Sequence, residues 1–244
     1  MLVRAVEASA FGTNCWVLAR GSGEECVVVD PGFGVVTALA DLLREHRLRP
    51  AAVLATHGHA DHVWSVTPVC RSAGEGVAVH VHPADRYRLG DPLAQLAPEL
   101  RAMLEQTFGP AERWQEPDRV VDLAGEVAGS GPAGHAAGGS RLSVAGLDLD
   151  VHHTPGHTEG SVVFHVEGDE GPLLLSGDLL FAGSVGRSDL PGGDPVAMTA
   201  SLRGVLPRFE DRAVVLPGHG PSTTMARERA SNPYLRAARD PGGL

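Results

Sequence analysis

The segment from Thr56 to His62, THGHADH, concentrates side chains that bind metal ions. Four of its seven residues carry an imidazole or a carboxylate: His57, His59, Asp61 and His62. A single histidine on an apolar face usually packs as an ordinary core residue, but burying three imidazoles and a carboxylate together is unfavourable unless something pairs them. A divalent metal ion that coordinates these side chains offsets the cost of burying them. On a loop, His57 and His59 can face one side while Asp61 and His62 face another, which suits two adjacent cations.

Three further residues of the same types each follow an apolar run and lie beside a glycine: His157 in TPGHT, Asp178 in SGD and His219 in PGHG. Strand ends are rigid while the loops after them can vary, so ligands placed there form a preorganised site. Together with the first segment they make seven nitrogen and oxygen ligands and no sulfur. This set suits Zn²⁺, Fe²⁺ or Mn²⁺, and one carboxylate can bridge two ions.

The elements before the first ligand segment alternate short β-like runs with turns. Residues 2–30 predict an antiparallel meander, and the apolar spacing of residues 35–48 predicts a helix that Pro50 ends. The apolar run 51–55 then predicts a buried strand that delivers the ligands. Residues 61–73 can continue from them as a helix.

Between the first and later ligand segments the pattern is less regular. Residues 83–114 predict two or three short helices broken by glycine and proline, which we interpret as an insertion near the site. The glycine-rich stretch 125–140 predicts a mobile loop, more a solvated excursion than a lid. Asp194 with Pro195 predicts the start of a helix, and a last helix is expected over residues 224–231.

Composition limits the class of protein. At 244 residues the chain suits one large domain, and its apolar runs are shorter than the roughly 18 residues that span a bilayer. The N-terminal stretch has no apolar signal segment, and the three cysteines are odd in number without CxxC spacing, so we expect reduced thiols in a cytoplasm. A net charge of −10 without a basic run disfavours nucleic acid as a partner. Oligomeric state is left open.

The order HxHxDH followed by a later His, Asp and His resembles the metallo-β-lactamase superfamily, and the resemblance extends over residues 2–232, including TNCWVL and VVVDPG. It implies an α/β fold, the four-layer αββα sandwich, as a catalytic domain with residues 83–141 as an insertion and 233–244 as a tail. It also implies two metal ions, zinc before iron or manganese. The implied ligands are His57, His59 and His157 for one ion, Asp61, His62 and His219 for the other, and Asp178 between them, with Asp30 bracing the ligand loop.

Within that superfamily, TPGHTEGS, LLSGDLLF and GRSDLPGG are similar to glyoxalase II. The similarity implies a hydrolase that cleaves a small acyl thioester such as S-lactoylglutathione, with a hydroxide between the metals as nucleophile and Asp61 positioning it. Glyoxalase II carries a helical C-terminal domain for glutathione, whereas only residues 221–244 follow Gly220, so no separate glutathione domain is expected and the thiol carrier stays open.

Substrate contacts are less sharply defined by the sequence. Two cations bring more positive charge than Asp61 and Asp178 cancel, so we expect a small anionic acyl-thiol substrate. Arg187 is expected either to pair with a substrate carboxylate or to brace its loop through a nearby aspartate. His82, before a proline, is a candidate for the pocket wall.

Three other functions remain open on sequence alone. One is a persulfide dioxygenase of the same superfamily, which uses a single iron held by two histidines and an aspartate, and another is a lactonase. The third, from a different class, is a binding or flavin-coupled redox module without hydrolysis. Metal content and an activity panel distinguish them.

Overall fold

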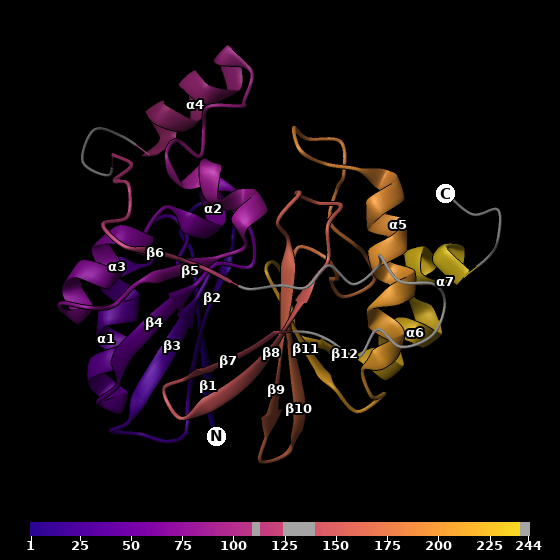
Figure 1. Ribbon diagram of the computed structural model, residues 1–244, viewed down its shortest axis with the longest axis horizontal. Helices are drawn as coiled ribbons and strands as arrows, with labels where there is room; N and C mark the ends of the chain where they lie inside the picture. The colour runs from indigo at the N-terminus through magenta and orange to yellow at the C-terminus, as the bar shows by residue number, and fades with distance from the viewer. Residues whose placement is uncertain (109–112, 124–139, 240–244) are drawn as a thin grey trace.

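Two six-stranded sheets pack face to face in the computed structural model, which describes residues 1–108, 113–123 and 140–239. Figure 1 shows one sheet built from the first part of the chain and the other from the second, with helices on the outer side of each. The four-layer αββα sandwich expected from the sequence is confirmed.

The first sheet has the strand order β1-β2-β3-β4-β5-β6. Its strands run antiparallel from β1 to β3 and parallel from β3 to β6. Helices α1 (Val36–His46) and α3 (Val66–Ala73) cover its outer face, where their apolar residues form one buried cluster with Val28 and Val53 of the sheet. The strands are β1 Leu2–Glu7, β2 Asn14–Ala19, β3 Glu25–Val29, β4 Arg49–Leu54, β5 Val79–Val81 and β6 Val120–Asp122.

The second sheet has the order β12-β11-β10-β9-β8-β7, antiparallel except for the parallel pair β10 and β11. Helices α5 (Pro195–Gly204), α6 (Met225–Ser231) and α7 (Pro233–Arg239) cover its outer face and pack on Leu174 and Val215. The strands are β7 Ser140–Val144, β8 Leu147–His153, β9 Val162–Gly168, β10 Gly171–Gly177, β11 Val214–Pro217 and β12 Thr223–Thr224, and a short 3₁₀ helix, η2, spans Leu206–Arg208.

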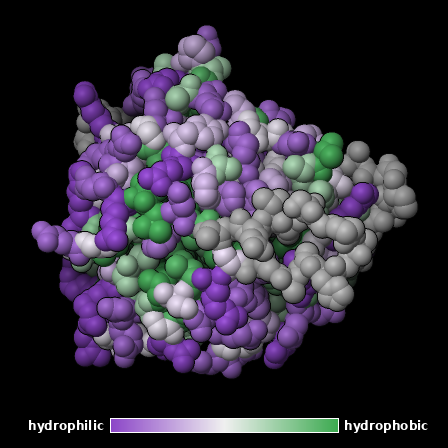
Figure 2. All heavy atoms as spheres, in the orientation of Figure 1, coloured by the Kyte–Doolittle hydropathy of each residue, from purple (hydrophilic) through white to green (hydrophobic). Residues whose placement is uncertain are grey.

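Apolar side chains from both sheets meet between them. Leu18 and Val29 of the first sheet lie in one buried cluster with Leu149, Phe164 and Leu216 of the second. Burying this much apolar surface is the main force that holds the sheets together. The face drawn in Figure 2 is mostly hydrophilic, with hydrophobic residues gathered near its centre.

Three expected boundaries differ from the structure. The first helix ends at His46, where Arg47 adopts a left-handed φ of 54°, and Pro50 instead lies inside β4. The single helix expected over 61–73 is two helices, α2 (Ala60–Val63) and α3. The expected tail from residue 233 begins as α7, because two of its apolar side chains are buried against α5.

Other expectations fit the described residues. Residues 83–114 contain the 3₁₀ helix η1 (Pro83–Leu89) and α4 (Pro98–Phe108), and Asp194 caps α5 by accepting hydrogen bonds from two backbone N–H groups. In the expected glycine-rich loop, only residue 140 is described, as the first residue of β7. In the described parts of the chain, helices are too short or too polar to cross a membrane.

Candidate metal centre

The seven expected ligands come from separate elements and meet at one edge of the sandwich. Each lies just after a strand, or in α2, which follows β4 directly. The structure brings their donor atoms into three overlapping groups, within which the atoms lie no more than 4.8 Å apart. The groups are His57 with His59 and His157, His57 with His62 and Asp178, and Asp61 with His62 and His219.

Asp30 lies directly behind the first ligand segment. Its carboxylate accepts hydrogen bonds from the Thr56 backbone N–H at 2.7 Å and the Thr56 hydroxyl at 2.6 Å. The same carboxylate lies 3.0 Å from Nδ1 of His62, and the Thr56 hydroxyl oxygen lies 3.0 Å from Nδ1 of His57. With Nδ1 of both rings held in this way, Nε2 of each ring is left to face the ligand groups.

Main-chain carbonyls orient two other histidines. Nδ1 of His157 donates to the carbonyl oxygen of Arg187 at 2.7 Å, and Nδ1 of His219 donates to that of Phe11 at 3.0 Å. A carbonyl can only accept, so Nδ1 of each ring carries a proton, and Nε2 is the nitrogen that faces the ligand groups. This is the form of imidazole that binds a metal ion.

The first group of donors fits a cation better than it fits protons. Nδ1 of His59 lies 2.8 Å from Nε2 of His157, and Nε2 of His57 is buried without a hydrogen-bond partner. One proton satisfies one nitrogen pair, whereas an ion between the three rings satisfies all of them. Oδ1 of Asp178 is also buried without a hydrogen-bond partner, although this carboxylate lies 3.4 Å from His157.

The group of Asp61, His62 and His219 lies on the other side of Asp178 from that of His57, His59 and His157. Nε2 of His62 lies 3.2 Å from Nε2 of His219, and Nε2 of His219 lies 3.2 Å from Oδ2 of Asp61. Asp178 approaches His62 at 3.3 Å, so it lies between the two groups. The donors therefore fit two adjacent ions with Asp178 between them.

The ionisation of these groups favours a cation. Burial lowers the pKa of His57 well below its ordinary value, and burial with the nearby His157 lowers that of His59 to about 3, so both rings are neutral. Burial alone would raise the pKa of Asp61, but His62 and a hydrogen bond with His219 hold it well below its usual range.

His62 differs from the other buried histidines. Burial alone would lower its pKa, but the carboxylates of Asp178, Asp61 and Asp30 raise it well above the ordinary value. The negative field that favours a proton on His62 equally favours a cation at its Nε2.

Asp85, a fully buried carboxylate in η1, was not predicted from the sequence as a site residue. Its Oδ2 accepts hydrogen bonds from the Gly58 N–H and the Thr158 hydroxyl, both at 2.7 Å, and its Oδ1 accepts one from the Gly160 N–H at 2.8 Å. Asp85 thus ties the loop of His57 to the loop of His157. Its place shortly after β5, resembling the ligands after their own strands, was the available signal.

The two expected substrate contacts lie in different places. Arg187 lines the cavity over the ligands, but its guanidinium donates to Asp189 through Nε at 2.7 Å and Nη2 at 2.8 Å, the loop-bracing alternative. His82 is absent from the described residues that line this cavity. Its ring stacks on His153 with centroids 3.9 Å apart, and its Nδ1 accepts a hydrogen bond from the Ala84 N–H.

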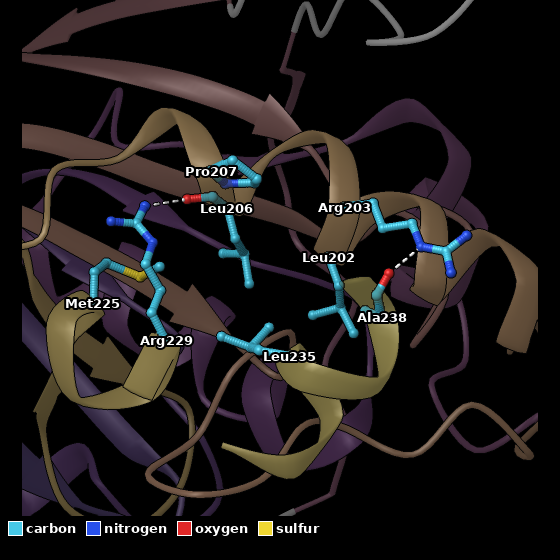
Figure 3. Close-up of a pocket in the computed structure, with 8 residues that line it drawn as sticks. All are labelled: Leu202, Arg203, Leu206, Pro207, Met225, Arg229, Leu235 and Ala238. Carbon is cyan, nitrogen blue, oxygen red and sulfur yellow. Dashed lines mark hydrogen bonds between the residues drawn. The ribbon is translucent and has the colours of Figure 1, made fainter. Parts of the chain in front are cut away.

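Two cavities in the described residues are candidates for the substrate site. The cavity over the ligands has a volume of about 450 Å³ and is bordered by His59, Asp61 and His219 among others. A second cavity, of about 250 Å³, lies within the layer of α5, η2, α6 and α7 (Figure 3). There, Arg203 and Arg229 both donate to main-chain carbonyls of that layer, so they serve the packing of the helices. The first cavity is the candidate site.

Comparison with known proteins agrees with this geometry. Residues 8–219 match the family model of the Metallo-beta-lactamase superfamily, and the chain belongs to this superfamily. An uncharacterized protein of Mycobacterium tuberculosis is 40% identical over 238 residues, covering 96% of this chain and 98% of the relative. The hydroxyacylglutathione hydrolase GloC of Haemophilus influenzae is 30% identical over 238 residues, covering 97% and 99%.

Solved structures show the same fold. The B3 metallo-beta-lactamase BLEG-1 superposes with a TM-score of 0.74 at 31% identity, covering 96% of this chain and 99% of that one. TTHA1623, solved in a di-iron-bound form, superposes with a TM-score of 0.68 at 33% identity, covering 95% and 100%. The chain is therefore a metallo-hydrolase of this superfamily by fold and by the donors that its site brings together.

Proposed function

We propose that this protein is a metal-dependent hydrolase that cleaves a small acyl thioester, with His57, His59, His157, Asp61, His62, His219 and Asp178 holding two divalent ions. The observation that carries the proposal is the convergence of five imidazoles and two carboxylates in adjacent groups beside an open cavity. The likeness to GloC over nearly the whole of both chains supports thioester cleavage. Zinc suits the donors best, and the iron found in TTHA1623 makes iron the second choice.

Bound ions of this kind supply a water of lowered pKa and polarise a substrate carbonyl. Asp61 is the residue of this chain that is placed to orient that water and to accept its proton. Its side chain is 25% exposed and borders the cavity, whereas that of Asp178 is 10% exposed. The Thr13 hydroxyl donates to Oδ2 of Asp61 at 3.3 Å, which leaves its other oxygen to accept a hydrogen bond from water and to take up a proton.

The test is metal analysis joined to an activity panel on the purified protein. We expect close to two divalent ions per chain and hydrolysis of thioesters, S-lactoylglutathione among them, that a chelator abolishes. His57→Gln should lower both metal content and activity, while His165→Gln, in β9 and away from the ligand groups, should lower neither.

The same panel separates the rival functions. One iron per chain with oxygen consumption on glutathione persulfide would establish the dioxygenase instead. Faster turnover of acyl-homoserine lactones than of any thioester would establish a lactonase. A metal-loaded protein inert to both substrate classes would favour the binding or flavin-coupled redox module.

A further inference from the structure

Two walls rise beside the ligand groups. One is formed by α4 and the turn before it, and the other by residues 181–190, in the loop that leads toward α5. Figure 1 shows α4 and that loop standing apart on opposite sides of the upper end of the molecule. The cavity of about 450 Å³ between them is large enough for a substrate of drug-like size.

Apolar side chains dominate both walls. A scattered exposed leucine means little, but a set of apolar side chains around one cavity beside polar ligands is the usual composition of a small-molecule site. Leu100 and Leu104 are four residues apart in α4, the spacing that places residues on one side of a helix, and Leu96 lies in the turn before this helix. The described apolar residues that line the cavity include Phe11, Leu96, Leu100, Leu104, Phe181 and Leu190.

The α4 wall is anchored rather than loosely attached. Leu104 is 7% exposed and lies in a buried cluster with Phe33, Ala60 and Trp64, so it fixes the helix next to α2. Leu100, one turn earlier, is 36% exposed and borders the cavity. A substrate chain lying along α4 would cover Leu100 without displacing the anchor.

Phe11, in the turn between β1 and β2, borders the cavity and orients a ligand. Its φ of 67° lies in the left-handed region, which is unfavourable for a bulky residue and persists where the surrounding structure requires it. In this conformation its carbonyl holds His219 at 3.0 Å, and its ring, 52% exposed, lines the cavity. The same backbone conformation therefore orients a ligand and presents an apolar surface beside it.

The walls offer little to a charged substrate group. Among the described lining residues, Arg187 is the one cation other than the histidines, and it is bound to Asp189 through two hydrogen bonds. The hydrogen bond from Arg187 lowers the pKa of Asp189 to about 2, which keeps that partner ionised. A carboxylate on the acyl group would therefore meet, in this wall, only a cation whose charge Asp189 already offsets.

On the basis of the proposed thioesterase function, we propose that the acyl group of the substrate is an uncharged aliphatic chain that lies between α4 and Phe11. Low-mass thiol carriers bear charged or amide groups that need polar partners, so the acyl group is the part of a thioester that matches these walls. A two-carbon or hydroxylated acyl group such as lactoyl would leave most of this apolar surface in water.

The experiment uses thioesters of one uncharged thiol, N-acetylcysteamine, with acetyl, butyryl, hexanoyl, octanoyl and lactoyl groups. We expect kcat/KM to rise with chain length by up to about fourfold per methylene, the limit for complete burial. The lactoyl ester should rank with the acetyl ester. Equal kcat/KM along the series, or a preference for lactoyl, would overturn the inference while leaving the hydrolase proposal intact.

Two variants on one helix localise the effect. Leu100→Gln should flatten the dependence on chain length, because it places an amide in the α4 wall. Met103→Gln, on the same helix but outside the cavity lining, should keep the full dependence. A dependence that survives Leu100→Gln unchanged would overturn the placement of the chain against α4.

A binding measurement separates this inference from the proposed function. Thioethers of N-acetylcysteamine with methyl, hexyl and octyl groups cannot be hydrolysed, and their affinity can be measured by calorimetry. Affinity should rise with chain length, and the heat capacity change on binding should become more negative. If no thioester is hydrolysed but the thioethers bind in this order, the function fails and the apolar subsite stands. If the thioethers show no order, the subsite fails.

Discussion

The two aspartates at the candidate metal centre have different surroundings, which indicate different roles for them. Both Asp178 and Asp61 line the cavity, but the side chain of Asp178 is only 10% exposed, whereas that of Asp61 is 25% exposed and receives a hydrogen bond from Thr13. Both are carboxylates of the same cluster, so residue type alone does not separate their roles. Its greater exposure makes Asp61 the one that can exchange a proton with water on the substrate side.

Replacing Asp61 tests that role. Asp61→Ala should lower hydrolysis by about 10²–10⁴-fold, the range of general base catalysis, because no other described carboxylate borders the cavity except Asp178. At least one metal ion per chain should remain, since His57, His59 and His157 are untouched. Steady-state kinetics with metal analysis measure both, and undiminished turnover would contradict the assignment. Asp118→Ala, at a surface ion pair, is the control.

The stacked pair of His82 and His153 makes a prediction about pH. Burial and the neighbouring His153 lower the pKa of His82 to about 4, below the ordinary value of about 6.5. Between pH 4 and 6.5 the histidine is protonated in the unfolded chain but neutral in the folded one. The contribution of His82 to the free energy of unfolding is therefore full above pH 6.5 and is lost as the pH falls toward 4.

Denaturant unfolding at pH 7.5 and pH 5 measures this effect. The free energy of unfolding of His82→Gln should fall less between the two pH values than that of the unchanged protein. His46→Gln, at the end of α1, removes a histidine outside the stack and should keep the original difference. Equal pH dependence in His82→Gln and the unchanged protein would show that His82 is not the titrating group.

At the scale of elements, η1 holds two ligand loops against each other. Besides the three hydrogen bonds to Asp85, the side chain of Arg88 packs so closely on Gly58 that a Cβ there would lie 2.7 Å from it. Gly160 has the same relation to Asp85, at 2.6 Å. Both loops therefore depend on glycine and on this short helix for their position.

Asp85→Asn should loosen both loops with little change in volume. An amide nitrogen cannot accept the hydrogen bonds that one carboxylate oxygen accepts, so we expect metal affinity to fall by about 10–100-fold, as for other groups that orient ligands. Competition with a chromophoric chelator measures this affinity directly, apart from catalysis. Asp118→Asn, on the surface, is the control, and unchanged affinity in Asp85→Asn would refute the positioning role.

At the scale of the whole molecule, the site needs both sheets. His57, His59, Asp61 and His62 come from the first half of the chain, and the other ligands from the second. The halves are joined by the apolar layer between the sheets, in which Phe164 is fully buried. Ligand geometry therefore depends on a core that lies away from the ligands.

Phe164→Ala tests this dependence. The free energy of unfolding should fall by about 3–5 kcal/mol, as for other large-to-small changes in cores. All three tryptophans, Trp16, Trp64 and Trp114, lie in the first half, and Trp64 and Trp114 lie outside the cluster of Phe164, so tryptophan fluorescence reports on the first half. We expect fluorescence and far-UV circular dichroism to shift together to lower denaturant. An unshifted fluorescence transition would show that the halves unfold separately.

Much of the fold and site could be predicted because the signals are local. These signals depend only on neighbouring residues: ligand types at strand ends, the alternation of apolar runs with glycines, and the Asp194 cap. From them the sequence predicts the strands, α5 and the grouping of the seven ligand residues. The failures were also physical. The first helix ends at Arg47 in a left-handed conformation, although the sequence has no glycine or asparagine at that position to predict it. Helix α7 forms because Leu235 and Ala238 are buried against neighbouring helices that are distant in sequence.

The sequence by itself determined which chemistry is available: nitrogen and oxygen donors in number and order typical of the superfamily, without thiolates among them. Only the tertiary structure decided how those donors are held and what they face. Asp85 bridges residues far apart in the chain, Phe11 reaches His219, and Arg187 turns to Asp189 rather than to the cavity. Such contacts depend on how the two sheets pack, which brings distant segments together by burial of apolar surface and leaves no mark at any single position.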